Sequence, residues 1–320
     1  MSRWIQKPPL GTPIIPGHPL AQGLVGCWLM NEGGGLYLND LSGKGNKGTL
    51  INGPLWVPGR TGPALSFDGS DDYVRIANFP KPTTQFTVSS WVYAKSAVTW
   101  GTIAKNWSDT VGPGQFHLGL DNTSGKISIY LTQSDSTVKG PVIDSNTLPL
   151  NTWQFITAVA DGSNLRLYRN GIEVRTPVAY NGTLLTSFSP IGIGVKFGDD
   201  GITPSSVPGY WNGLINEVRI YNRALRPEEI QWLYTDPYAM FEQPRRAKWF
   251  VSAGVYAETL ISLAVSASTI VAVQTFINIV SDQIQSASSL TEAQTYIQNL
   301  LSELESLSVV EAIQTYLATL

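Results

Sequence analysis

The sequence predicts an all-β protein, built as a sandwich of two antiparallel sheets with one short helix. Short runs that alternate apolar and polar residues recur between residue 24 and about residue 221, and a period of two is typical of half-buried strands. Turn-forming residues separate the runs, and about a dozen strands are more than one open sheet holds without curling or splitting. Helical periodicity first appears in residues 223–234, RALRPEEIQWLY.

Nine runs predict individual strands, and most are bounded by turn-forming Gly, Pro, Asn or Asp. They are residues 64–68, 72–77, 86–95, 116–121, 126–132, 153–160, 164–170, 190–195 and 213–221. The clearest hairpin is LRLYRNGIEV, where Asn170 and Gly171 supply the positive φ of a tight turn. In the predicted helix, Pro227 suits the first turn, and the two glutamates after it favour the positive end of the helix dipole.

Composition excludes several classes of function. Charged residues make up 14 % of the chain and the net charge is −3, so no broad positive field attracts nucleic acid or an anionic membrane. The single cysteine, Cys27, has no partner for an intrachain disulfide and is predicted to be a small buried side chain. The proline-rich residues 1–23 predict neither a signal peptide nor a helix, but an extended arm that lies on a neighbouring surface.

The chain is predicted to have two folded parts after this arm. The sandwich occupies residues 24–244, and a basic linker with Arg245, Arg246 and Lys248 opens residues 245–265. Beyond Trp249 the chain has no Lys, Arg, Pro or Trp, and residues 266–320 contain three repeats with a period of 20 residues. An internal period of this length is typical of a repeated structural unit.

The three repeats are predicted to mediate self-association. Matching positions hold Gln274, Phe276, Gln294, Tyr296, Gln314 and Tyr316. Alternation and β-branched residues favour β-type repeats, while the heptad-like spacing of other positions keeps a helical hairpin or bundle open. Either form has too little core to stand alone, so the repeats should pack against copies of themselves, with a trimer as the natural closure. Residues 260–273 are apolar enough for a membrane span, but the Ser/Thr content and the missing flanking charges disfavour one.

Six segments resemble, in the same order, the signatures of laminin G-like, concanavalin A-type jelly-roll domains. They are LVGCWLMNEGGG, LNDLSGKGNKGTL, ALSFDGSDDYVRI, FTVSSWVYAK, NTWQFITAVADGSNLRLYRNG and GLINEVRIYNRALRPEEIQWLY, between residues 24 and 234. The resemblance implies the two-sheet jelly roll of the lectin/glucanase superfamily. The flanking segments RWIQKPPLGTP and YAMFEQPRRAKW resemble those of phage-encoded members, which implies a virion protein.

The same resemblance implies one structural Ca²⁺, bound by loop carboxylates and backbone carbonyls. The candidate ligands in this chain are Asp40, Asn46, Asp68 and Glu217. Asn216 stands where many relatives have Asp, so one charge is missing from that set. The adjacent Asp71 and Asp72 are predicted to belong to a turn, because Asp-Gly-Ser-Asp favours hairpin turns.

No catalytic residue is predicted. Hydrolases that share this fold place alternate acids on one strand, but Glu217 has no acidic partner two or four positions away. The two histidines, His18 and His117, lie in no nucleophile or metal motif.

A sugar site is the remaining prediction for a small ligand, because lectin-like sites combine a flat aromatic face with polar loop groups. The candidates for stacking on a pyranose ring are Trp100, Trp107, Tyr210 and Trp211, each of which could instead only cover the edge of the sandwich. Three other tryptophans, Trp28, Trp91 and Trp153, lie in apolar strands and are predicted to be core residues.

These observations predict a non-enzymatic structural virion protein, such as a capsid decoration or tail-fibre component, that folds in the host cytoplasm and displays a lectin-like jelly roll. Its predicted partners are copies of itself, in a homotrimer, and other virion subunits. It is not predicted to bind nucleic acid or a membrane. The alternative is a carbohydrate-binding module that tethers the particle to host or mucus glycans. A glycoside hydrolase is the outlying alternative.

Overall fold

The computed structural model describes residues 6–108, 114–186 and 190–242. The chain divides into two units, Met1–Pro244 and Arg245–Leu320, and every described residue belongs to the first. The predictions for the basic linker and for the three repeats therefore lie outside the described residues.

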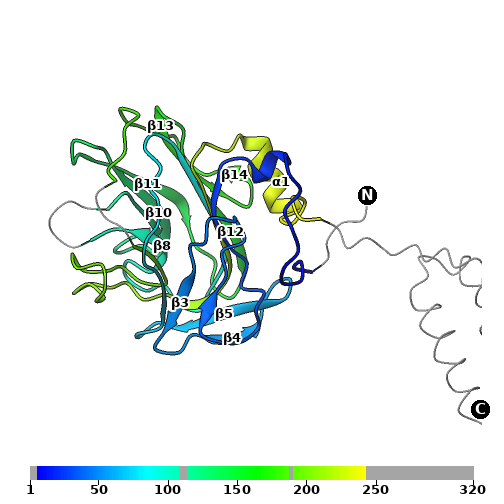
Figure 1. Cartoon of the computed structure of the whole chain (residues 1–320). Coiled ribbons are helices and arrows are strands. Elements are labelled where there is room, and N and C mark those ends of the chain that lie inside the picture. The colour runs from blue at the N-terminus through cyan, green and yellow to red at the C-terminus, as the bar shows by residue number, and fades with distance from the viewer. Residues whose placement is uncertain (1–5, 109–113, 187–189, 243–320) are drawn as a thin grey trace, which may run out of the picture. The chain divides into compact units, whose positions relative to one another are not determined.

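The described chain is a sandwich of two antiparallel β-sheets, as the sequence predicts (Figure 1). In chain order the strands are β1 (Leu24–Trp28), β2 (Tyr37–Leu38), β3 (Gly48–Ile51), β4 (Leu55–Pro58), β5 (Pro63–Asp68), β6 (Tyr73–Ile76), β7 (Phe86–Ala94), β8 (Thr102–Asn106), β9 (Phe116–Leu120), β10 (Lys126–Thr132), β11 (Val138–Thr147), β12 (Trp153–Ala160), β13 (Asn164–Arg169), β14 (Ile172–Glu173), β15 (Val178–Ala179), β16 (Ile191–Ile193) and β17 (Asn212–Tyr221).

The two sheets differ in strand order and are named here the back sheet and the front sheet. The back sheet has nine strands in the order β14-β13-β12-β7-β17-β5-β4, with β1 also paired to β17 and β15 to β13. The front sheet has eight strands in the order β11-β10-β9-β8-β16-β6-β3-β2. Their facing sides enclose the main core, which includes Trp28, Phe67, Phe86 and Phe116. Alternating residues of each strand point into this core, and the residues between them point outward.

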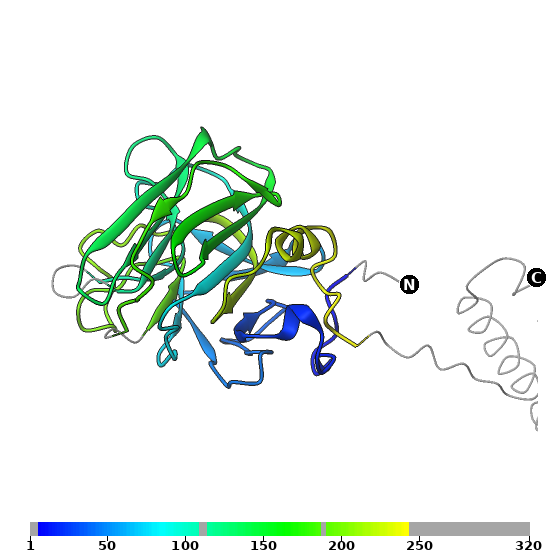
Figure 2. The ribbon, with the colours of Figure 1, turned by 90° about the horizontal axis from the view of Figure 1, so that it is seen from above.

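The outer face of the back sheet is covered by the chain itself. The short helix η1 (Pro19–Ala21) and the helix α1 (Pro227–Thr235) lie on the same side of the sandwich (Figure 2). Leu20 and Ile230 are fully buried there with Phe155 and Tyr221 of the sheet, which forms a second apolar cluster. The outer face of the front sheet lacks such a helical layer in the described part of the chain, so it is the sheet face that these helices leave open to a ligand.

The described part of the N-terminal arm lies on its own domain. The amide of Lys7 donates to the carbonyl of Thr61 (2.9 Å), the amide of Ile15 donates to Met240 (2.8 Å), and Ile14 forms a β-bridge with Phe241. Residues 6–23 therefore pack on their own domain, and the prediction that they extend onto a neighbouring surface is wrong. The physical reason is apolar burial, since Leu20 contributes to the cluster outside the back sheet.

Several local predictions are confirmed. The turn between β13 and β14 has Asn170 at φ 54° and Gly171 at φ 83°, and α1 begins at Pro227 as predicted. Cys27 is fully buried. The turn after Asp68 is also present, but it connects β5 of the back sheet with β6 of the front sheet instead of closing a hairpin. Among the described residues, no helix is long and apolar enough to cross a membrane.

Candidate functional site

A row of polar and charged side chains crosses the outer face of the front sheet. In the strand register, Tyr130 of β10 lies opposite His117 of β9, and His117 lies opposite Lys105 of β8. Because Phe116 and Leu118, the neighbours of His117, both belong to the main core, His117 points to the other face. The outer face of β8, β9 and β10 therefore brings together residues from three separate runs of the sequence.

Four rings gather at this row, and we call Trp100, Trp107, His117 and Tyr130 the aromatic patch. The ring centroids of Trp100 and His117 are 5.5 Å apart, as are those of His117 and Tyr130. Tyr130 also lies 6.1 Å from Trp100 and 6.5 Å from Trp107. These separations and inclined ring planes are typical of interacting aromatic side chains. Two of the four predicted sugar-stacking residues, Trp100 and Trp107, are thus brought together by Tyr130.

Trp100 has an unusual backbone conformation. Its φ is 58°, in the left-handed region, which costs a residue with a side chain roughly 1–2 kcal/mol. Its carbonyl oxygen accepts hydrogen bonds from the Lys105 ammonium nitrogen (2.9 Å) and from the Thr102 hydroxyl (3.3 Å). Gly209 passes so close that a Cβ at that position would collide with the same carbonyl. The surrounding structure therefore holds Trp100 in place against its own backbone preference.

Two titratable side chains of this row, Lys105 and His117, are almost completely buried. Burial lowers the pKa of Lys105 well below its ordinary value, and Lys196 lowers it further. Burial also lowers the pKa of His117 well below 6.5, with Lys105 adding to the effect. The imidazole is therefore neutral at pH 7, and its Nε2 lies 3.3 Å from the Ser128 hydroxyl. A neutral imidazole and a hydroxyl can each donate or accept a hydrogen bond, so this buried pair can satisfy itself inside the sheet.

The neutral state of His117 predicts a pH-dependent stability. Because its folded-state pKa is lowered, the unfolded chain binds more protons below about pH 6.5, and the free energy of unfolding falls as the pH falls, by up to about 1.4 kcal/mol per pH unit for one group. We expect His117→Gln, which cannot titrate, to show a shallower decline between pH 7 and pH 5 than the wild type. Urea unfolding across this range measures the difference, and parallel curves for the two proteins would contradict the assignment.

The other two predicted stacking residues lie elsewhere. Tyr210 is partly exposed and its ring is 6.5 Å from that of Tyr73; burial raises the pKa of its hydroxyl, with Tyr73, Asp71 and Asp68 contributing. Trp211 is only 1 % exposed and belongs to the main core. The prediction that Trp211 stacks on a sugar is therefore wrong, because its ring is packed between the sheets.

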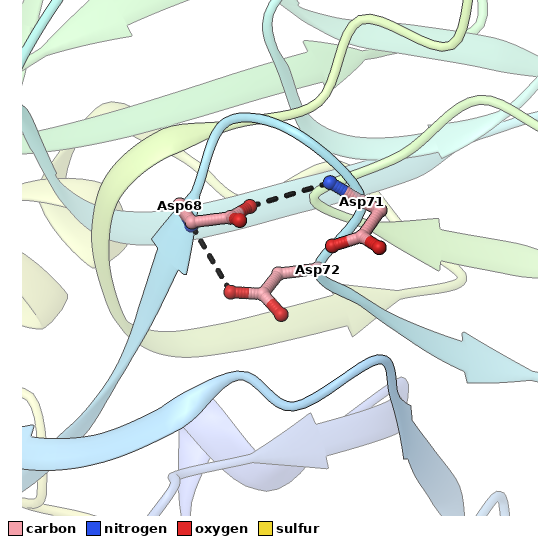
Figure 3. A group of neighbouring side chains, drawn as sticks. All are labelled: Asp68, Asp71 and Asp72. Atoms are coloured by element: carbon pink, nitrogen blue, oxygen red, sulfur yellow. Dashed lines mark hydrogen bonds between the residues drawn. The ribbon is translucent and has the colours of Figure 1, made fainter.

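Three aspartates cluster at the turn between β5 and β6, namely Asp68, Asp71 and Asp72 (Figure 3). One oxygen of each lies within 4.8 Å of the others. However, Asp68 Oδ1 accepts hydrogen bonds from the amides of Ser70 (2.8 Å) and Asp71 (3.3 Å), and Asp72 Oδ2 accepts from the amide of Asp68 (3.1 Å). These bonds are those of a capped turn, as the sequence predicts for Asp71 and Asp72.

The predicted calcium ligands lie in three different hydrogen-bonded groups. Asp40 accepts from the amides of Cys27, Ser42 and Asn46 (2.9 Å each) and from the Asn46 side chain (3.0 Å), so both of its oxygens fix the loop. Asp68 belongs to the turn described above. Glu217 is fully buried and forms an ion pair with Arg219. Among the described residues, the carboxylates close enough to share a metal ion are those of Asp68, Asp71 and Asp72, so Asp40, Asn46, Asp68 and Glu217 do not form one shell.

Four residues of this region are not among the predicted site residues, namely Lys105, His117, Ser128 and Tyr130. A signal was present in the runs FHLGL and KISIYLT, which flank the predicted turn DNTSG. Pairing these runs as a hairpin places His117 opposite Tyr130 and turns both away from the apolar positions. The contribution of β8 could not be found in this way, because Lys105 lies beyond another turn.

Comparison with known proteins agrees with this architecture. The family model of the concanavalin A-like lectin/glucanases superfamily matches residues 68–231, just over half of the chain. The chain belongs to this superfamily. The match includes β6 to β17 and the start of α1, and so the whole aromatic patch lies within the superfamily domain. No curated protein matches the chain in sequence.

Solved structures share the superfamily fold at low sequence identity. Domain 4 of AbnA, an extracellular GH43 arabinanase from Geobacillus stearothermophilus, was solved in complex with arabinotriose; it has a TM-score of 0.52 and 19 % identity, over 66 % of this chain and 98 % of that domain. The receptor-binding domain of botulinum neurotoxin D has a TM-score of 0.50 and 17 % identity, over 69 % of this chain and 54 % of the toxin domain. The receptor-binding domain of the mosaic serotype C/D neurotoxin has a TM-score of 0.51 and 18 % identity, over 68 % of this chain and 51 % of the toxin domain. The chain thus spans about half of each toxin domain.

Proposed function

We propose that the lectin/glucanase-like domain is a non-catalytic carbohydrate-binding module, and that the aromatic patch is its sugar site. The observation that carries the proposal is the strained backbone of Trp100 at φ 58°, held by Lys105 and Thr102 so that its ring lies beside His117 and Tyr130. Backbone strain of this kind concentrates at functional sites. The rings of Trp100, Trp107 and Tyr130 are partly exposed and offer apolar faces to a pyranose ring, while the buried His117 supports them from below.

Two further observations support binding without catalysis. The fold is shared with a domain solved in complex with arabinotriose and with receptor-binding domains of toxins. Glycosidases use two carboxyl groups on either side of the scissile bond, whereas one carboxylate, that of Asp121, acts on Tyr130 of the patch, and the charged groups that act on His117 and Lys105 are lysines. A module that binds glycans without cleaving them is the function these features favour.

A glycan array with the full chain tests the proposal. Trp100→Ala is expected to weaken binding at least about tenfold, which corresponds to about 1.4 kcal/mol, because an aromatic stacking face is lost. Trp107→Ala should weaken binding in the same direction. The matched control is Trp232→Ala, which removes an exposed tryptophan from α1 on the opposite side of the sandwich and should bind like the wild type.

Three outcomes would contradict this function. The first is the absence of binding to any glycan, and the second is binding that both Trp100→Ala and Trp107→Ala leave unchanged. The third is release of reducing sugar from a bound polysaccharide, which would show catalysis.

We also propose that the module is a structural component of a virus particle, assembled in the host cytoplasm, and that residues 266–320 join it into a homotrimer. The support comes from the sequence, through the phage-like flanking segments and the three low-charge repeats. The full chain is expected to have three times the protomer mass in solution, whereas a chain that ends at Pro244 should be a monomer with an intact sandwich. Multi-angle light scattering measures both masses. An unchanged oligomer after truncation would refute the role of the repeats.

A further inference from the structure

Lys7 of the N-terminal arm buries its ammonium group against the domain. Its side chain is only 7 % exposed. Its ammonium nitrogen donates hydrogen bonds to three backbone carbonyl oxygens, those of Met30 (3.2 Å), Asn216 (2.7 Å) and Pro63. An ammonium group has three donors and no acceptor, so these carbonyls satisfy it completely. The three acceptors come from three separate segments, namely the end of β1, the start of β5 and the middle of β17.

The backbone around Lys7 is shaped to present these oxygens. Met30 has a φ of 52°, an unfavourable value for a residue with a side chain. Asn216 is the residue at which the pairing of β17 with β7 shifts register between Ile215 and Glu217, and such a bulge re-aims backbone groups. Gly62, at φ 127°, lies against the aliphatic stem of Lys7. We call the carbonyls of Met30, Pro63 and Asn216 the carbonyl cage.

Further unpaired polar atoms belong to the residues of the cage or to their chain neighbours. Asn31 Oδ1, Glu32 Oε2 and both Oδ1 and Nδ2 of Asn216 are buried without a hydrogen-bond partner; Asn31 and Glu32 are the two residues that follow Met30. Burial lowers the pKa of Lys7 to about 7, while Glu217 and Glu32 act to raise it. Arg219 acts to lower the pKa of Lys7, but less strongly than either carboxylate raises it, so the surrounding charges favour a cation at this position.

We infer that the carbonyl cage is an internal cation-binding site and that the tethered ammonium of Lys7 is its resident cation. Backbone carbonyls and amide oxygens are also ligands that Ca²⁺ accepts. This assignment accounts for the misfit of the predicted calcium ligands at Glu217, because the chain supplies its own cation beside that residue and Arg219 neutralises the carboxylate. Removing the Lys7 side chain should then open the cage to an inorganic cation.

Calcium binding to full-length Lys7→Ala tests the inference, at one pH unit below the Lys7 pKa of about 7. Chelator-treated protein is titrated with CaCl₂ in a calorimeter and melted with and without millimolar Ca²⁺. The variant is expected to melt below the wild type and to gain at least about 4 °C when Ca²⁺ is added, through binding to the folded state alone. The wild type should show no such gain.

Two other variants make the result specific. Lys7→Met keeps the aliphatic stem against Gly62 but removes the charge, so it serves if Lys7→Ala does not fold. Lys44→Met removes an exposed lysine and should behave like the wild type. The inference is overturned if neither Lys7 variant binds Ca²⁺, whatever its stability, or if the wild type and the Lys7 variants respond to Ca²⁺ equally.

Discussion

Replacing Arg219 with methionine is expected to lower the free energy of unfolding by about 3–5 kcal/mol, because the change leaves a buried carboxylate without its counterion. Both Arg219 and Glu217 have side chains that are 0 % exposed. The Nη2 atom donates to Glu217 Oε2 (3.2 Å) and to the carbonyl of Pro237 (2.7 Å), and Nη1 lies 3.0 Å from Glu217 Oε1. Urea unfolding followed by tryptophan fluorescence measures the loss.

A double-mutant cycle separates this ion pair from simple loss of packing. Glu217→Gln alone should also destabilise the domain, because it leaves the guanidinium of Arg219 buried and unpaired. The double variant Glu217→Gln with Arg219→Met should lose clearly less free energy of unfolding than the two single variants lose in sum, since neither charge then remains. Strictly additive losses would show that the two side chains act independently and would contradict the predicted coupling.

Replacing Trp28 with alanine is expected to cost about 3–5 kcal/mol, the range for a large aromatic side chain removed from a packed core. Trp28 is fully buried, its ring centroid lies 6.0 Å from that of Phe79, and its Nε1 donates to the carbonyl of Asn46 (2.7 Å). The change therefore creates a cavity and also leaves a buried carbonyl without its donor. The midpoint of thermal unfolding should fall accordingly.

A second tryptophan provides the comparison for Trp28. Trp232 on α1 is 38 % exposed and contacts the ring of His18 at 4.8 Å. Trp232→Ala is expected to cost less than about 1 kcal/mol, as substitutions away from the core usually do. Similar losses in the free energy of unfolding for Trp28→Ala and Trp232→Ala would contradict the prediction that packing between the sheets contributes most to stability.

The local fold could be predicted from the sequence because its determinants are local. Alternation in the strand runs, the Asn170–Gly171 turn and the proline at the start of α1 each act within a few residues, and the structure has all three. The path between the sheets could not be predicted in the same way. The segment from Asp68 to Tyr73 has the composition of a hairpin turn, yet it crosses from β5 to β6 because the strands beside them pair with distant partners.

The candidate site could be predicted only in part, because its members meet through long-range pairing. Trp100 and Trp107 were found as aromatic residues beside loops, whereas the adjacent Tyr130 and Lys105 become neighbours only once β8, β9 and β10 are aligned. Trp211 was misassigned because Tyr210 and Trp211 are adjacent in the sequence, and the pattern does not show which of the two faces inward. The Lys7 contact with Asn216 spans 209 positions of sequence, far beyond any local signal.

The bridge between the two ends of the described domain affects how it bears mechanical load. The amide of Ile15 donates to the carbonyl of Met240 and the amide of Glu242 donates to the carbonyl of Pro13 (2.8 and 2.9 Å). A pulling force applied between Pro13 and Glu242 therefore acts on these two hydrogen bonds before it reaches β1 and β17. We expect these two bonds to break before any strand pairing of either sheet is lost, so the ends of the domain can separate while the sandwich stays folded.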